Sequence, residues 1–286
     1  MKARKVLDPV LFSRNKIPRC FLLPFEGKVS GVFFYFQDPP YSFPATLKIP
    51  SMLLPVLFED DDYIAINKPS GLLVHKTKIA KDDNPQFALQ LLRDQIGQKV
   101  YPLHRIDRPT SGVLLFSKSA AAATLFQSQF TAKEIEKSYL AVVRGYMPAD
   151  HAVIDHPLKK ELIGDLQEAK TEYWKLAEVE IPMASSSKYP SSRYSLIRLY
   201  PHTGRMHQLR RHMAHSRNYI IGDTTHGQNK QNTFFRENFD MNNLLLHACK
   251  LGFIHPLNQG KVEINAPLPP HFSTIMEAFG WDMEGI

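Results

Sequence analysis

Residues 104–112, read as HRIDRPTSG, form a polar turn that runs directly into the apolar stretch GVLLFSK. Because Pro109 fixes its own φ and a glycine closes the turn, the run predicts a tight loop anchored on a buried strand. Asp107 lies between Arg105 and Arg108, and cationic neighbours favour the ionised form of a carboxylate. An ionised Asp on a rigid loop can be a nucleophile or a base; the alternative is an Asp that only pairs with its own turn.

A second segment holds all of the chain's excess positive charge. Between residues 181 and 222 there are seven Lys or Arg and no Asp or Glu, while the whole chain has 35 basic and 28 acidic residues. The positive charge is therefore local. A basic run is often only a solvated face, but this one is interleaved with tyrosines, which suits a phosphate backbone with stacking bases nearby. The segment favours an acidic partner such as a nucleic acid.

The order of predicted strands and helices indicates a mixed α+β fold. Alternating apolar patterns predict strands, and patterns with a period of 3.6 predict helices. The predicted strands are residues 57–67 (a strand pair), 112–118, 137–144, 193–200, 245–254 and 261–265. The predicted helices are residues 84–97, 120–134, 205–216 and 272–279. Successive strands without a glycine-rich nucleotide loop favour an α+β fold over a doubly wound sheet.

Composition excludes several classes of protein. With 286 residues, 43% of them hydrophobic, the chain can bury a sizeable core as one large domain or two lobes. Two cysteines provide no disulfide framework, and no apolar run reaches membrane-spanning length, so we expect a cytoplasmic protein that binds no membrane. Histidines crowd the basic segment without the spacing of a zinc motif, and we expect no metal.

Several ordered motifs resemble those of the RluA-type pseudouridine synthases. Besides the two segments above, they are NKPSGLLVH (67–75), KSYLAVVRG (137–145), IIGDTTHG (220–227) and LLLHACKLGFIHP (244–256). A protein kinase also carries a His-Arg-Asp loop, but its Asp directly follows the Arg, and this chain has no glycine-rich phosphate loop. The kinase interpretation is therefore rejected.

The resemblance spans residues 53–282 and implies a fold and a domain division. It implies a pseudouridine synthase catalytic domain over residues 53–286, preceded by an N-terminal extension of unknown role over residues 1–52. The implied catalytic fold has a central, mixed and mostly antiparallel sheet in two halves, flanked by helices. The active cleft is expected to lie between the two halves.

The resemblance also implies catalytic residues. Asp107 stands at the position of the family's essential aspartate, which starts cleavage of the bond from ribose C1′ to uracil N1, after which the base rotates and rejoins through C5. Whether the carboxylate attacks C1′, attacks C6 or removes a ribose proton stays open. Arg210 is expected to hold Asp107 bidentately. Tyr139 is expected to stack on the uracil and assist loss of the C5 proton, although its strand pattern alone equally suits a core residue.

Other residues are expected to contact the RNA. Chemistry on a paired base requires the nucleotide to leave the stack, and Arg105 matches the family arginine that fills the gap. The remaining predicted RNA contacts are Arg108, Arg205, His207, Arg211 and Arg217. His207 is also expected to orient the Arg210 loop, and His104 to brace the Asp107 loop. For Arg211 and Arg217 taken singly, a solvated helix surface is an equally good interpretation.

The expected activity is a cofactor-free isomerisation of a uridine in RNA. Three tracts, RDQIGQKVYPLHRIDRPTSGVLLFSKS, KYPSSRYSLIRLYPHTGRMHQLRRHMAHSRNYIIGD and the tract around QNTFFRENF, most resemble one tRNA-modifying group of the family. That resemblance implies a tRNA substrate with its target uridine at position 65 of the tRNA. His226 adds support, because it stands where many family members carry Tyr and the same group shares this departure. The alternatives are 23S ribosomal RNA as the substrate, an RNA-binding protein that has lost the reaction, and a hydrolase with Asp107 as its base. We expect a monomer.

Overall fold

The computed structural model describes residues 5–6, 52–75, 86–132, 134–160 and 164–282. Its strands are β1 (Lys5–Val6), β2 (Val56–Glu59), β3 (Tyr63–Lys68), β4 (Tyr101–Pro102), β5 (Ser111–Ser117), β6 (Glu136–Arg144), β7 (His151–Asp155), β8 (Leu158–Lys159), β9 (Leu166–Gln167), β10 (Lys170–Ile181), β11 (Ser192–Pro201), β12 (Leu246–Ile254) and β13 (Lys261–Asn265). Its helices are α1 (Ala88–Ile96), α2 (Ala120–Ala132), α3 (Gln208–His215), α4 (Asn229–Phe239) and α5 (Pro270–Ala278).

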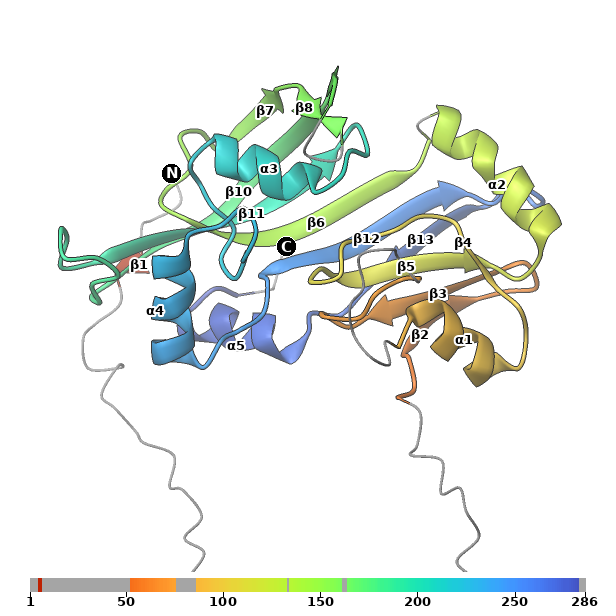
Figure 1. Ribbon diagram of the computed structural model, residues 1–286, viewed down its shortest axis with the longest axis horizontal. Coiled ribbons are helices and arrows are strands. Elements are labelled where there is room, and N and C mark those ends of the chain that lie inside the picture. The colour runs from red at the N-terminus through yellow and green to blue at the C-terminus, as the bar shows by residue number, and fades with distance from the viewer. Residues whose placement is uncertain (1–4, 7–51, 76–85, 133, 161–163, 283–286) are drawn as a thin grey trace, which may run out of the picture. The chain divides into compact units, whose positions relative to one another are not determined.

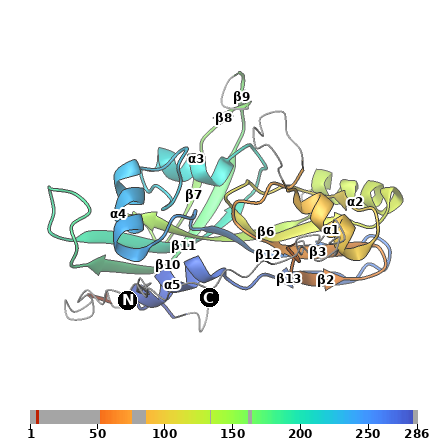
Figure 2. The same ribbon diagram turned by 60° about the horizontal axis from the view of Figure 1, so that its bottom comes forward.

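One large sheet organises the described residues. Its eleven strands there run in the order β1-β10-β11-β6-β12-β5-β3-β2, while β13, β4 and β7 pair with β12, β5 and β10. Every pairing is antiparallel except β1 with β10 and β5 with β12. Figures 1 and 2 show the helices lying against this sheet. The predicted mixed, mostly antiparallel sheet flanked by helices is confirmed.

The parallel contact of β5 with β12 joins the two halves of the sheet. It is short, with Ser111 opposite His247 and Gly112 opposite Ala248. Gly112 has φ +113, and a side chain there would collide with the backbone of Ala248, so only glycine fits this close approach. The Ser111 hydroxyl lies 2.9 Å from Nδ1 of the buried His247. The Asp107 loop enters β5 at this junction.

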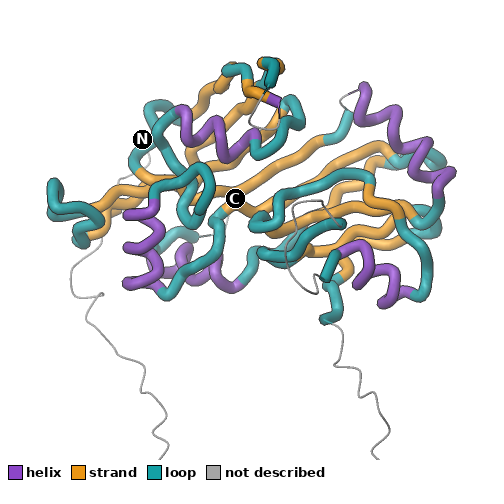
Figure 3. Tube along the Cα trace, viewed as in Figure 1, coloured by secondary structure: helices purple, strands orange, loops and turns teal. Residues whose placement is uncertain are grey.

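Separate apolar cores support the two halves. In the half built from β2, β3 and β5, α1 packs one core through Leu91 and Leu92, and α2 packs another through Ala122 and Phe126. In the half built from β6, β10 and β11, helix α3 packs its own core through Leu209 and Met213. Figure 3 shows these helices outside the strands. Each functional loop is therefore attached to an independently packed support.

Most predicted elements are present, but two helices begin later than predicted. Helix α1 begins at Ala88, because Phe87 is extended and bridges to Leu73; residues 84 and 85 lie outside the described residues. Helix α3 begins at Gln208 instead of Arg205, because the Gln208 side chain accepts the Arg205 N–H and His207 is left-handed with φ 52°. A residue with positive φ cannot continue a right-handed helix.

Strand β10 and helix α4 were not predicted. Several side chains of β10 are half-buried, so buried and exposed positions do not alternate cleanly along its twelve residues. Its charged residues therefore hide the alternating apolar pattern by which a strand is predicted. Helix α4 is mostly polar and its N-cap residue, Gln228, provides no side-chain cap. Both elements are defined by tertiary contacts: β10 by pairing with β11 and β7, and α4 by buried Phe234 and Phe235.

Strand β1 shows one contact of the predicted extension. Lys5 and Val6 pair in parallel with Val179 and Glu180 of β10. The rest of residues 1–51 lies outside the described residues, so the predicted domain boundary stays a prediction. Among the described helices, none combines the length and apolarity needed to cross a membrane.

Candidate active site

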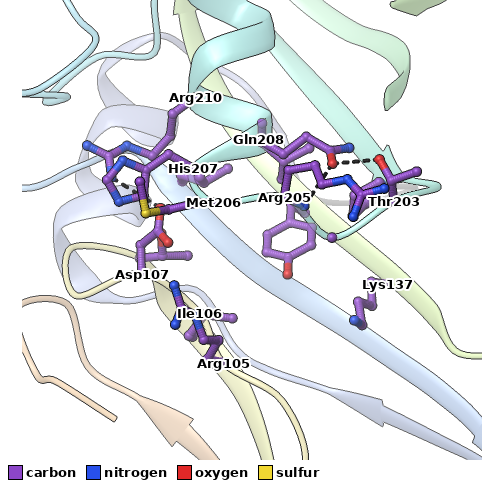
Figure 4. Close-up of a pocket in the computed structure, with 16 residues that line it drawn as sticks. Arg105, Ile106, Asp107, Lys137, Thr203, Arg205, Met206, His207, Gln208 and Arg210 are labelled. Carbon is purple, nitrogen blue, oxygen red and sulfur yellow. Dashed lines mark hydrogen bonds and ion pairs between the residues drawn. The ribbon is translucent and has the colours of Figure 1, made fainter. Parts of the chain in front are cut away.

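A cavity of about 230 Å³ lies where the two motif-rich segments meet. The Asp107 loop supplies one wall, the turn before α3 and its first residues supply another, and β6 supplies Tyr139 and Lys137. Figure 4 shows Arg210 reaching Asp107 on one side of the cavity, with Lys137 toward the other side. The cavity thus spans the two halves of the sheet, as the predicted cleft does.

Arg210 is the centre of a buried charge network. Its Nη1 donates to Asp107 Oδ2 at 3.1 Å, while Nε and Nη2 donate to Asp223 Oδ2 and Oδ1 at 2.8 and 2.7 Å. The predicted contact with Asp107 is present, but the prediction of a bidentate contact there is wrong. The bidentate partner is Asp223, whose side chain is 1% exposed against 22% for Asp107. Asp107 therefore keeps acceptor capacity facing the cavity.

The Arg210–Asp223 pair stays ionised despite its burial. Burial disfavours both charged forms, but the mutual hydrogen bonds and charges raise the pKa of Arg210 and lower the pKa of Asp223. Asp223 Oδ1 also accepts the backbone N–H groups of Thr225 and His226. Asn232 of α4 donates to the Asp223 carbonyl and accepts from Gly222. Asp223 therefore shapes its own turn and also fixes the Arg210 guanidinium, a role that the sequence did not reveal.

A chain of buried polar groups fixes α3 on β10. Gln208, at the start of α3, donates to the Lys170 carbonyl and to the Thr171 hydroxyl, and its Oε1 accepts from Thr203 and Arg205. The Thr171 hydroxyl also lies 2.8 Å from His212 Nδ1. Burial lowers the pKa of His212, so its ring is neutral and donates from Nε2 to the His156 carbonyl. Two successive turns of α3 are thus held by Thr171.

The KPSG turn braces the Asp107 loop from the other side. Lys68 is fully buried, and its ammonium donates to the carbonyls of Pro69, Leu72 and Arg108. Burial lowers the pKa of Lys68 to about 7, and the charge of Asp107 opposes that shift. Arg108 in turn donates through Nε to the Gly71 carbonyl. The NKPSGLLVH motif resembles the family, but the sequence does not predict that its Lys68 holds the Asp107 loop through backbone carbonyls.

Two aromatic side chains are held uncharged beside Asp107. His104 Nε2 accepts the backbone N–H of Leu115, and burial lowers the pKa of His104 to about 3, so the neutral ring braces the loop against β5. The charge of Lys137 adds to this shift. Burial raises the pKa of Tyr139, and the charge of Asp107 raises it further, so its phenol stays protonated. Tyr139 can therefore stack or donate a hydrogen bond, but as a phenol it is a poor base.

The other predicted RNA contacts occupy three different places. Arg105 is exposed at the cavity and has no hydrogen-bond or ion-pair partner among the described residues. Arg205 also lines the cavity and donates to the Glu168 carbonyl. Arg211 lies outside it and donates to the carbonyls of Lys159 and Met206. Arg217 lines a separate pocket beyond the far end of α3.

His207 lies against His226 rather than bonding the Arg210 loop directly. Their Nδ1 and Nε2 atoms are 2.9 Å apart. Burial lowers the pKa of both rings, which keeps them neutral beside Arg210. Within the described ranges, no group of three or more His, Cys, Asp and Glu side chains is arranged to hold a metal ion.

Solved structures of known proteins share the fold of this chain. Human RNA Pseudouridylate Synthase Domain Containing 4 matches with a TM-score of 0.61 at 22% identity, covering 80% of this chain and 94% of that chain. Human RNA Pseudouridylate Synthase Domain Containing 1 matches with a TM-score of 0.60 at 22% identity, covering 76% and 84%. At this level of identity, these two structures establish the fold alone.

Sequence similarity establishes the family. A protein of Vibrio vulnificus (strain CMCP6) named tRNA pseudouridine synthase C is 47% identical over 239 residues, which are 80% of this chain and 96% of that protein. One of the same name from Haemophilus influenzae (strain ATCC 51907 / DSM 11121 / KW20 / Rd) is 45% identical over 240 residues, covering 80% and 99%. Residues 62–215 match the family described as RNA pseudouridylate synthase. The chain belongs to the RNA pseudouridylate synthase family.

Proposed function

We propose that this protein is a tRNA pseudouridine synthase, which isomerises one uridine of tRNA to pseudouridine without a cofactor. The observation that carries the proposal is Asp107, which faces a cavity between the two halves of the sheet and is held by one hydrogen bond from the buried Arg210. The similarity to proteins named tRNA pseudouridine synthase C supports tRNA as the substrate. A tRNA-modifying enzyme acts where tRNA is, which supports the cytoplasm as its location.

The reaction keeps all atoms of the base and exchanges one bond for another. The C1′–N1 bond breaks, the uracil rotates, a C1′–C5 bond forms, and the proton on C5 leaves while N1 gains one. In our proposal, ionised Asp107 starts the cleavage, and Arg210 keeps the carboxylate charged and oriented. Tyr139 stacks on the uracil as a neutral phenol, so its contribution is positioning and hydrogen bonding.

Base flipping follows from the position of Asp107 inside the cavity. A uridine within folded RNA must leave its stack to reach this carboxylate, at a cost of a few kcal/mol. Arg105 is exposed at the same cavity and unpaired among the described side chains, so its guanidinium is available to fill the vacated place. Arg205 and His207 line the cavity and complete the proposed contact surface for the nucleotide.

The proposal is tested by mapping pseudouridine in RNA after incubation with the purified protein. Unmodified tRNA and ribosomal RNA are treated separately, and pseudouridine is located by carbodiimide-dependent stops of reverse transcription. We expect one new stop in tRNA, at position 65, and none in ribosomal RNA. A stop in ribosomal RNA alone would mean that the protein forms pseudouridine but acts on ribosomal RNA instead of tRNA. Tight RNA binding without a stop in either RNA would contradict the enzyme assignment.

A further inference from the structure

A second polar pocket lies at the opposite end of α3 from the active cavity. It has a volume of about 450 Å³ and is lined by Arg144, Arg193, Arg217, Ser186, Asn218 and Tyr189, among others. No acidic side chain is among the described residues that line it. Of its lining residues only Arg217 was among the RNA contacts predicted from the sequence, and the proposed chemistry uses none of them. We call it the distal arginine pocket.

Two of its three arginines are available to an anion. Arg193 is paired with Glu180, at 3.1 Å, and lies over the ring of Tyr146. The guanidinium groups of Arg144 and Arg217, in contrast, have no ion-pair or hydrogen-bond partner among the described residues. Arg144 is half-buried and Arg217 is exposed. Unpaired guanidinium groups converging on a pocket without carboxylates favour a phosphate ligand.

The walls of the pocket are held by partly buried hydrogen bonds. Asn218 donates to the carbonyls of Arg144 and Tyr146, which fixes the turn after β6. Opposite it, the Ser192 hydroxyl donates to the Met183 carbonyl and contacts Ser185, which also accepts a hydrogen bond from Gln231 of α4. A pocket held in this way presents its arginines without a further cost of ordering the backbone.

An aromatic side chain stands beside the arginines. Tyr189, in the connection between β10 and β11, is 55% exposed, and the ammonium of Lys188 lies 5.1 Å from the centre of its ring. An exposed ring next to a phosphate site can stack on an unpaired base, and a lysine over the ring adds attraction for the backbone. The pocket therefore combines the two contacts that single-stranded RNA makes.

The distance to the active cavity suits one continuous RNA. Arg144 ends β6, five residues beyond Tyr139, which corresponds to about 16 Å at the rise of a strand. Arg217 lies two residues beyond the end of α3, whose first turn carries Arg210. A stacked strand advances about 3.4 Å per nucleotide, so the pocket is roughly five nucleotides from the reacting base.

We propose that the distal arginine pocket binds backbone phosphates of the substrate RNA about five nucleotides from the flipped nucleotide, one at Arg144 and one at Arg217, with Tyr189 stacking on an unpaired base beside them. The inference rests on the proposed function only for the identity of the RNA. The binding step itself needs no turnover. It gives this end of α3 a role in docking the RNA, separate from the chemistry at the other end.

The test measures RNA affinity as a function of salt concentration. The full-length chain and its Arg144→Gln/Arg217→Gln variant are compared on whole tRNA and on a short hairpin that carries the target uridine but too few flanking nucleotides to reach the pocket. On tRNA, we expect the variant to bind several-fold more weakly, and the slope of log Kd against log salt to fall by about 2, one for each lost phosphate contact. On the short hairpin, we expect the two proteins to be equal.

Controls separate this result from a general loss of charge or of folding. Arg93→Gln removes one exposed arginine from α1, outside the pocket, and should leave the tRNA slope unchanged. If the double variant unfolds, Arg217→Gln alone changes only an exposed side chain and should lower the slope by about 1. An unchanged slope on tRNA, or an equal loss on the short hairpin, overturns the proposal. If the salt slopes are as expected but the mapping experiment finds no pseudouridine, the proposed function is rejected and the proposed RNA-binding role of the pocket is retained.

Discussion

At the scale of single residues, Arg210 connects the structural carboxylate of Asp223 to the proposed catalytic carboxylate of Asp107. Its guanidinium is 3% exposed and divides its donors unequally, two toward Asp223 and one toward Asp107. The fully buried Asp223 compensates the charge of Arg210, and the more exposed Asp107 is left with oxygen lone pairs for the substrate. Arg210 therefore orients the Asp107 carboxylate with one hydrogen bond and leaves its other acceptor positions open to the cavity.

We expect Asp223→Asn to lower both stability and turnover. The substitution leaves the Arg210 charge buried beside a neutral amide, and breaking a buried pair in this way costs roughly 3 kcal/mol or more. It also frees the guanidinium to rotate, so the single-turnover rate should fall at saturating RNA. Chemical denaturation and single-turnover assays measure the two effects, with the exposed Asp61→Asn as the control. Wild-type stability and rate in Asp223→Asn would mean that Asp223 does not position Arg210.

The sequence predicted the site at Asp107 and Arg210 but missed their supports. Both predicted residues lie in dense motifs, and their contact is present at 3.1 Å. Asp223 acts through a side-chain pair with Arg210 that only the folded chain brings together. Lys68 and Gln208 act through backbone carbonyls, such as those of Leu72 and Lys170. Contacts of this kind leave no residue pattern, because a carbonyl is present at every position.

At the scale of elements, the parallel junction of β5 and β12 is held by a neutral histidine. His247 is fully buried, donates through Nε2 to the Ala266 carbonyl and accepts from the Ser111 hydroxyl at Nδ1. Burial lowers the pKa of His247 to about 4, a shift that the Ala266 hydrogen bond opposes and the charge of His271 reinforces. Protonation would put an unpaired charge at the junction that positions the Asp107 loop.

We expect His247 to make folding stability depend on acid pH. Its folded pKa lies below the unfolded value of 6.5, so the unfolded state binds the proton more readily, and the contribution of the neutral ring is lost as pH falls from 6.5 to about 4. Relative to a His247→Asn variant, the wild-type protein should lose up to about 3 kcal/mol of unfolding free energy across this window. Denaturant titrations at several pH values measure both proteins. Parallel pH profiles would contradict the assignment.

Elements with clean periodicity were predicted, and those defined by neighbours were not. Strand β13 has the predicted bounds, β6 begins one residue earlier than predicted, and β11 is one residue longer than predicted at each end. The start of α3 was misplaced because a glutamine side chain and a left-handed His207 end the preceding turn. The polar helix α4 carries little apolar signal, yet its Asn232 supports the turn of Asp223.

At the scale of the whole molecule, the fold places four of the seven basic residues of the charged segment at two separate sites. Arg205 and Arg210 line the active cavity, and Arg193 and Arg217 line the distal arginine pocket. In our proposals, one end of helix α3 therefore serves the chemistry and the other serves RNA docking. The sequence could predict a basic segment facing RNA. Which of its residues line the cavity and which line the pocket depends on the strands that lie beside each end of α3, and only the fold determines this.

The central claim is that Asp107 breaks the glycosidic bond of a uridine, and tritium release tests it most directly. In tRNA labelled at C5 of uridine, forming the C1′–C5 bond expels tritium into water, whereas binding or base flipping alone expels none. Single-turnover release is measured for wild-type protein and Asp107→Asn, each at saturating RNA, with Kd determined in parallel. We predict release by the wild-type protein, none by Asp107→Asn, and affinities that agree within a few-fold. Equal release by the two proteins would show that another group performs the chemistry.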